Sequence, residues 1–176
     1  VGSGVAYQHI LIASLYNTWG EYDLALEQSL FADSILKYII ERSSLSQNQR
    51  TIRVAKKNMG QNISLQAEIN INLKQFDDAL IQIRTASQLL QNWPYAFVDH
   101  MEVESKFYFA SEELYLALES LDRGLKICDL EGLDIRKVSL LKKKLDLLAN
   151  GLLEYETLTG NEISRVLAGK ALNRDS

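Results

Sequence analysis

Few side chains in this 176-residue sequence combine the types and spacing that metal binding requires. The clearest pair is His100 and Glu104, because residues four apart share one face of a helix and both can ligate a metal. His9 lacks a Cys or carboxylate at ligand spacing on both sides. The competing interpretation is that both histidines are exposed or packed in a helical structure, and we expect no metal site.

The remaining candidates for catalysis are also few. Cys128, the single cysteine, shares an apolar helical phase with Leu121 and Leu125, so we expect a buried thiol and not a nucleophile. The chain contains neither the His-Glu-x-x-His motif of zinc proteases nor the Gly-x-x-x-x-Gly-Lys-Ser/Thr loop that binds nucleotide phosphates. We therefore expect no catalytic residue, no cofactor and no enzymatic activity.

Composition excludes further classes. The net charge of -4 argues against nucleic-acid contact, which requires a basic surface. No apolar run approaches the roughly 20 residues of a membrane span, and the start does not resemble a signal peptide. The single cysteine fits a reducing compartment, so we expect a cytoplasmic location unless a targeting signal precedes the segment. The start, Val1-Gly2-Ser3-Gly4, indicates a fragment or residues left by an expression vector.

Three stretches of the chain share one pattern of small residues. In each, a small residue is followed after twelve positions by the Ala of an Ala-Leu pair, and after seven more by another small residue. The three sets are Ala13, Ala25, Ala32; Ala67, Ala79, Ala86; and Ser105, Ala117, Gly124. Small residues at these spacings allow two helices to approach closely. Each stretch therefore predicts a helical hairpin with a short polar turn.

The turn of the first unit, Gly20-Glu21-Tyr22-Asp23-Leu24-Ala25, is similar to that of tetratricopeptide (TPR) repeats, and residues 6–129 resemble this family. The family's aromatic residue in the first helix and its closing proline are absent, and the units recur after 54 and 38 residues where a regular array repeats at about 34. The extra length contains a predicted polar loop at 43–49, followed by residues 50–58, which we expect to lengthen the next helix.

The expected fold class is all-α, a TPR-like α-solenoid of antiparallel helical hairpins with C-terminal capping helices. Helices are expected at 5–18, 22–42, 48–73, 76–91, 95–110, 112–129 and 134–155, with a short helix at 161–168. The expected repeat domain spans 5–147, with hairpins at about 5–42, 48–91 and 95–129. The helix from Asp134 is predicted to cap the array because its apolar residues recur at spacings of three and four: Ile135, Val138, Leu141, Leu145, Leu148 and Leu152.

The C-terminal tail, residues 148–176, contains a second resemblance. The run Leu152-Leu153-Glu154-Tyr155-Glu156-Thr157-Leu158-Thr159-Gly160-Asn161-Glu162-Ile163 resembles the C-terminus of FtsH-type AAA+ metalloproteases. A fusion, a borrowed packing unit and coincidence are the three explanations. Without the zinc and nucleotide motifs, the protease activity does not transfer.

The resemblance to TPR repeats implies a concave groove lined by the first helices of successive hairpins. Translating the repeat register predicts twelve groove residues: Tyr7, Ile10, Ser14, Asn17, Gln61, Ser64, Glu68, Asn72, Asp99, Glu102, Lys106 and Phe109. Amides can hold the backbone of an extended peptide, and aromatic rings can hold its side chains. Family members that bind chaperone tails use a Lys/Asn/Arg clamp, whereas this wall carries three carboxylates.

A row of cations on the predicted third helix is the second candidate surface. Arg50, Arg53, Lys56 and Lys57 form either a solvated helix face or a docking face for an acidic partner. In contrast, the run Lys142-Lys143-Lys144 surrounds its helix and indicates only solubility.

The pattern as a whole predicts a module that binds a protein or peptide. By analogy of fold, it would be the regulatory or sensory part of a larger bacterial signalling protein. The alternative is a structural module that self-associates into a homo-oligomer through the apolar faces of its end helices. A fragment related to a membrane metalloprotease is the third interpretation.

Overall fold

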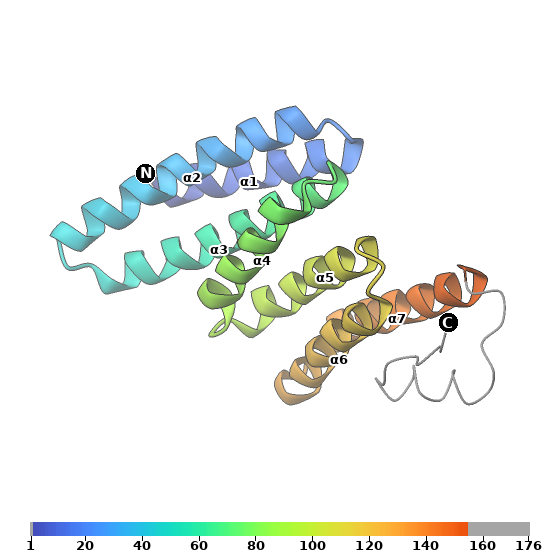
Figure 1. Cartoon of the computed structure of the whole chain (residues 1–176). Coiled ribbons are helices and arrows are strands. Elements are labelled where there is room, and N and C mark those ends of the chain that lie inside the picture. Colours follow the sequence, from blue (N-terminus) through green and yellow to red (C-terminus); the bar gives the residue numbers. More distant parts are fainter. Residues whose placement is uncertain (1, 155–176) are drawn as a thin grey trace.

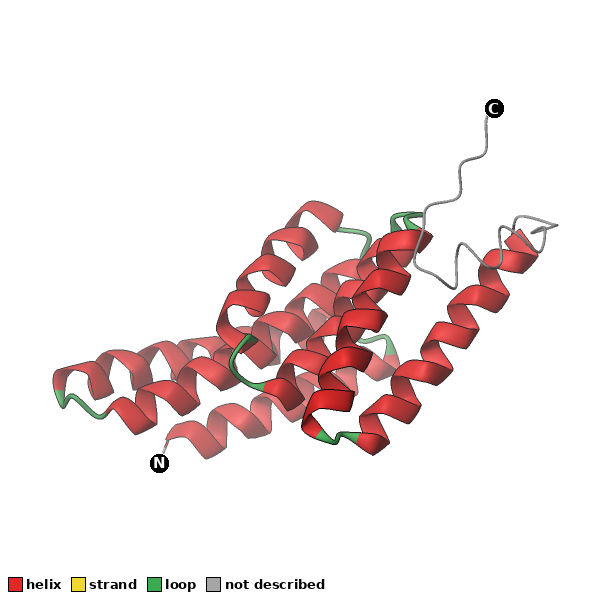
Figure 2. Ribbon diagram, turned by 90° about the horizontal axis from the view of Figure 1, so that it is seen from below, coloured by secondary structure: helices red, strands yellow, loops and turns green. Residues whose placement is uncertain are grey.

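The computed structural model describes residues 2–154, which form helices joined by short turns (Figure 1). The helices are α1 (Gly2–Trp19), α2 (Tyr22–Leu45), α3 (Gln49–Asn72), α4 (Phe76–Leu90), α5 (Pro94–Ala110), α6 (Leu114–Glu131) and α7 (Asp134–Glu154). Within this range there is no strand, as Figure 2 shows. The all-α class is confirmed. The short helix expected at 161–168 lies outside the described residues.

The three predicted hairpins turn in the same way. In each, a residue with left-handed backbone follows the first small residue of the unit by seven positions: Gly20 (φ 80°), Lys74 (φ 61°) and Glu112 (φ 63°). The next N–H donates to the carbonyl oxygen five residues earlier, from Glu21 to Tyr16 at 2.9 Å, from Gln75 to Asn70 at 2.8 Å and from Glu113 to Tyr108 at 2.8 Å. This bond caps the C-terminal end of the first helix. The repeated sequence pattern therefore corresponds to a repeated local structure.

The nine small residues of the pattern are all buried. Four alanines of the first hairpin, including Ala13 and Ala25, share one core cluster with Leu36 and Ile69. Ala67 and Ala79 occupy the next cluster. A side chain without bulk lets neighbouring helices approach closely, which explains why the same spacing recurs in each hairpin.

Helices pack with their neighbours in sequence, and α1, α3, α5 and α7 also pack with one another in turn. The pairs α1/α2, α3/α4 and α5/α6 form hairpins, and α2, α4 and α6 each also contact the helix that follows. In addition, α1 contacts α3, α3 contacts α5, and α5 contacts α7. The first helices of successive hairpins, together with α7, therefore lie side by side (Figures 1 and 2).

The connection between the first two hairpins is shorter than expected. The sequence predicted a polar loop at 43–49, but α2 continues to Leu45 and only three residues separate it from α3. Asn48 caps α3, because its side-chain oxygen accepts a hydrogen bond from the Thr51 N–H at 3.1 Å. As expected, residues 50–58 lengthen α3. The inserted residues thus extend two helices instead of forming a loop.

Helix α7 packs through a different face from the one that its sequence indicated. The apolar row that predicted a capping helix is largely exposed, with Ile135 at 89%, Val138 at 68% and Leu145 at 66% exposure. Instead, Leu140 and Leu147 join the cluster that contains Cys128. Cys128 is buried, as predicted, and this burial raises the pKa of its thiol. Of the helices described, none has the length and apolar character needed to cross a bilayer.

Candidate functional site: a groove along the first helices

Two adjoining hollows lie where α1, α3, α5 and α7 run side by side. The first has a volume of about 390 Å³ and is lined mainly by α1, α3 and α5. The second, of about 550 Å³, extends to α6 and α7. Glu68, Glu102 and Lys106 line both, so the two hollows adjoin. We call them together the groove.

The twelve residues predicted for the groove all line it. Nine line the first hollow: Tyr7, Ile10, Ser14, Gln61, Ser64, Glu68, Asp99, Glu102 and Lys106. The remaining three line the second hollow: Asn17, Asn72 and Phe109. They come together because equivalent positions of α1, α3 and α5 face the same side. Whether the groove binds a peptide stays a prediction.

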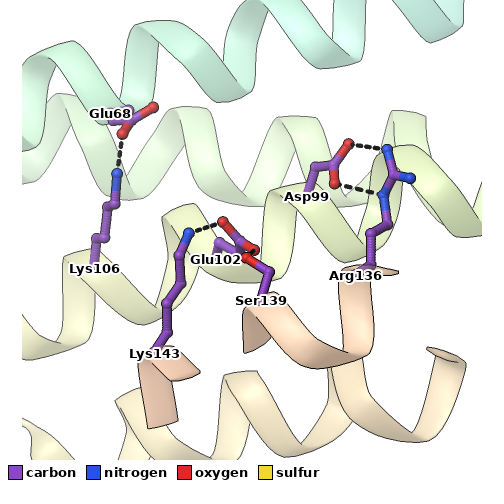
Figure 3. A network of polar contacts seen from close by, with 7 residues as sticks. All are labelled: Glu68, Asp99, Glu102, Lys106, Arg136, Ser139 and Lys143. Atoms are coloured by element: carbon purple, nitrogen blue, oxygen red, sulfur yellow. Dashed lines mark hydrogen bonds and ion pairs between the residues drawn. The ribbon is translucent and has the colours of Figure 1, made fainter. Parts of the chain in front are cut away.

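Every carboxylate among the twelve residues is paired with a cation (Figure 3). Glu68 of α3 pairs with Lys106 of α5. The other two carboxylates lie on α5 and pair with cations of α7. Asp99 accepts two hydrogen bonds from the Arg136 guanidinium, at 2.8 and 3.0 Å, and Glu102 pairs with Lys143. These ion pairs connect α3 to α5 and α5 to α7 along the groove.

Helix α7 supplies groove residues that the sequence interpretation missed, because Lys143, Asp146 and Leu147 line the second hollow. Arg136 and Ser139 line neither hollow, but they contact the groove carboxylates Asp99 and Glu102. Arg136, Ser139 and Lys143 lie on one face of α7, and Ser139 Oγ donates to Glu102 at 3.3 Å. Their spacing of three and four residues was the available signal. The interpretation of the lysine run as a solubility feature was wrong, because Lys143 pairs with Glu102 and Lys144 with Asp122. Burial lowers the pKa of Lys143, and the charges of Glu68 and Asp99 partly oppose that shift.

The two predicted asparagines are bonded to each other. Asn72 Nδ2 of α3 donates to Asn17 Oδ1 of α1 at 2.9 Å. Each amide keeps one polar atom, Asn17 Nδ2 and Asn72 Oδ1, with no hydrogen bond to another described residue. The pair therefore offers one donor and one acceptor group side by side, which suits the backbone of an extended peptide.

A buried histidine forms part of the floor of the first hollow. His100 Nδ1 lies 2.9 Å from Ser64 Oγ, and its Nε2 lies 2.9 Å from Ser87 Oγ. Burial lowers the pKa of His100 to about 4, so the ring is neutral at neutral pH. Ser64 is itself buried and its hydroxyl is engaged, so it supports the floor of the hollow instead of its wall.

The two histidines and the His100–Glu104 spacing, which were the candidates for metal binding, do not form a metal site among the described residues. Glu104, the spacing partner of His100, pairs with Arg123, while both ring nitrogens of His100 face serine hydroxyls. His9 Nδ1 bonds to Gln28 Oε1 at 2.7 Å, and its ring packs edge-on against Phe31. Among residues 2–154, no three His, Cys, Asp or Glu side chains cluster closely enough to hold a metal ion.

The surface of the groove is mixed in its chemistry. It combines amides and hydroxyls with apolar side chains such as Tyr7, Leu11 and Phe109. The ion pairs among them each consist of two opposite charges that neutralise each other. Asp146 lines the second hollow without an ion pair to any described residue. In comparisons with known proteins, no family model, no curated protein and no solved structure matches this chain.

Proposed function

We propose that the chain is a TPR-like module whose groove binds an extended segment of a partner protein. The observation that carries this proposal is the position of the twelve residues, which come from three hairpins and line two adjoining hollows. Residues at equivalent repeat positions form one wall, and such a wall suits a ligand that is itself extended.

The charges of the groove favour a ligand recognised through its backbone and apolar side chains. Glu68, Asp99 and Glu102 already pair with cations, so a charged ligand that bound to these pairs would have to displace an internal partner. The amides of Asn17 and Asn72 can bond to a peptide backbone, and Tyr7 and Phe109 supply apolar contacts. This chemistry differs from the basic clamp that holds a terminal carboxylate.

A variant that fills the groove without removing any internal contact tests the proposal. Ser14 lines the first hollow and is exposed, so Ser14→Trp should block ligand entry and leave the fold intact. Ser34→Trp is the matched control, because Ser34 is an exposed serine of α2 that lies outside the groove. A phage-displayed library of short peptides supplies the probe. The wild type and Ser34→Trp should enrich the same peptides, and Ser14→Trp should not bind them.

Two results would contradict this function. One is a wild-type protein that enriches no peptide; the other is equal binding of the selected peptides by both tryptophan variants. Replacing Asn17 and Asn72 together by Ala should also weaken binding. Because these amides bond to each other across α1 and α3, thermal unfolding of that double variant has to be measured beside its affinity.

Self-association is the second candidate function, and the exposed row on α7 favours it. Ile135, Val138, Leu141 and Leu145 form an apolar row on an end helix. Pairing of this row between copies would remove it from water. Light scattering over a concentration series should then show a growing mass that the Val138→Lys/Leu145→Lys variant lacks. A wild type that stays monomeric at every concentration would exclude this function.

A further inference from the structure

The N-terminal half of α3 carries four cations that are not balanced by neighbouring acids. We call Arg50, Arg53, Lys56 and Lys57 the basic face. None of the four forms an ion pair with a described residue, whereas the cations of the groove and Lys144 of α7 all do. The basic face is therefore a local excess of positive charge on a chain whose net charge is -4.

Trp93 organises the basic face from the turn between α4 and α5. The guanidinium carbon of Arg53 lies 4.8 Å from the centre of the Trp93 ring, and Lys57 Nζ lies 5.6 Å from it. Cation–π contacts of this kind contribute about 0.5–1 kcal/mol each at exposed sites. These contacts restrict both long side chains before any partner binds. Binding a partner there therefore costs less side-chain conformational entropy than binding it at free surface lysines.

An open hollow lies beside this ring. Arg53 and Lys56 line it together with Trp93 and three amide side chains, those of Gln49, Gln88 and Asn92. No carboxylate is among its lining residues. The hollow thus joins positive charge to groups that can donate to, and accept from, a peptide backbone.

The cations of the basic face repel one another and the positive end of the helix dipole, so their arrangement lowers the stability of α3 locally. These cations begin in the first turn of α3, where the helix dipole is positive, and they lie three or four residues apart on the same helix. Each such repulsion costs a few tenths of a kcal/mol. A bound anion would relieve this cost, and local conflicts of this kind are typical of functional surfaces.

We propose that the basic face and Trp93 dock an acidic segment of a partner polypeptide. The positive charge selects carboxylate side chains, and the three amides around the hollow suit a peptide main chain. The net charge of -4 opposes the approach of a long polyanion such as a nucleic acid. This surface shares no lining residue with the groove, so the two sites can be tested separately.

Fluorescence of Trp93 provides the measurement. The chain has two tryptophans, so a Trp19→Phe background leaves Trp93 as the only indole. Titration with a hexaglutamate peptide should change its emission saturably, and added salt should weaken the binding. Arg53→Gln/Lys56→Gln should reduce the affinity by about tenfold or more. The matched control, Lys126→Gln/Lys142→Gln, removes the same charge from two exposed lysines elsewhere and should bind as the background does.

Several results would overturn the proposal. Hexaglutamine could bind as tightly as hexaglutamate, or the control variant could lose as much affinity as the variant of the basic face. An oligouridylate of equal charge could bind more tightly than hexaglutamate at the same salt concentration, which would assign the surface to nucleic acid. Absence of any saturable response from the Trp19→Phe protein would remove the acidic-peptide site, whatever the groove binds.

Discussion

Asn62 of α3 and Ser29 of α2 form a reciprocal hydrogen-bonded pair in the interior. Ser29 Oγ donates to Asn62 Oδ1 at 2.9 Å, and Asn62 Nδ2 donates to the Ser29 carbonyl oxygen at 2.9 Å. Both residues have an exposure of 0%. Because α2 ends the first hairpin and α3 begins the second, this pair joins two hairpins through buried polar atoms.

Truncating Asn62 should destabilise the protein more than truncating its partner. Asn62→Ala removes both hydrogen bonds and leaves the Ser29 hydroxyl buried without its acceptor, so we expect a loss of about 2–3 kcal/mol in the free energy of unfolding. Ser29→Ala keeps the bond to the main-chain carbonyl and should cost about 1 kcal/mol. Urea unfolding measures both. Equal losses in the two variants would show that the second bond contributes nothing.

Gly60 should be required for the contact between α3 and α4. A Cβ atom placed on Gly60 would lie 2.8 Å from Leu90 Cδ2 and 2.9 Å from Leu89 Cβ. Gly60→Ala should therefore destabilise by about 1–3 kcal/mol, because overpacking exceeds the roughly 1 kcal/mol that alanine adds in a helix. Gly4→Ala is the control, since nothing lies within 4 Å of that position. In thermal unfolding, the midpoint temperature should fall for Gly60→Ala and rise for Gly4→Ala. A Gly60→Ala variant that is more stable than the wild type would contradict the close packing.

His100 should make stability depend on pH in the mildly acidic range. Burial lowers its pKa to about 4 from 6.5 in the unfolded chain, so the unfolded state binds the proton more tightly. Above the unfolded pKa, the imidazole is neutral in both states and has no effect. As the pH falls from about 7 to about 5, its contribution should lower the free energy of unfolding by about 2 kcal/mol. Urea titrations of wild type and His100→Gln measure this term, and an equal pH dependence in both would refute it.

The ion pairs between α5 and α7 should help to hold α7 in place. In the Asp99→Asn/Glu102→Gln variant, Arg136 and Lys143 lose their charged partners, so amide hydrogen exchange in α7 should become faster. Because these side chains are partly exposed, each pair should contribute only about 0.2–1 kcal/mol, and less in high salt. Glu119→Gln, an exposed position on α6, is the control. Unchanged exchange in α7 would show that its contacts with α6, which include Leu140 and the Lys144–Asp122 ion pair, are enough to hold this helix.

The sequence alone determined the helical hairpins and the wall that they share. Small residues such as Ala13, Ala67 and Ser105 can be identified without a structure, because close helix packing excludes larger side chains at fixed positions of each unit. Once the repeat register is known, equivalent positions must face the same side. For this reason, residues as distant as Tyr7 and Phe109 can be assigned to one groove from the repeat register alone.

Sequence patterns could not predict two features, the backbone conformation of two hairpin turns and the hydrogen bonds in the floor of the first hollow. Gly20 indicates a left-handed turn by its type, but Lys74 and Glu112 adopt the same conformation only because the packed helices on either side require it. Likewise, no spacing indicated that His100 would bond to both Ser64 and Ser87, since the three residues come from three helices.

The tertiary structure alone decided what closes the groove and how its charges are balanced. Helix α7 follows no repeat register, and its apolar row from Ile135 to Leu145 indicated the opposite packing face. Only its contact with α5 brings Arg136 to Asp99 and Lys143 to Glu102. The physical reason is that a repeat is a local pattern of packing, whereas ion pairs between residues about forty positions apart depend on where the final helix comes to lie.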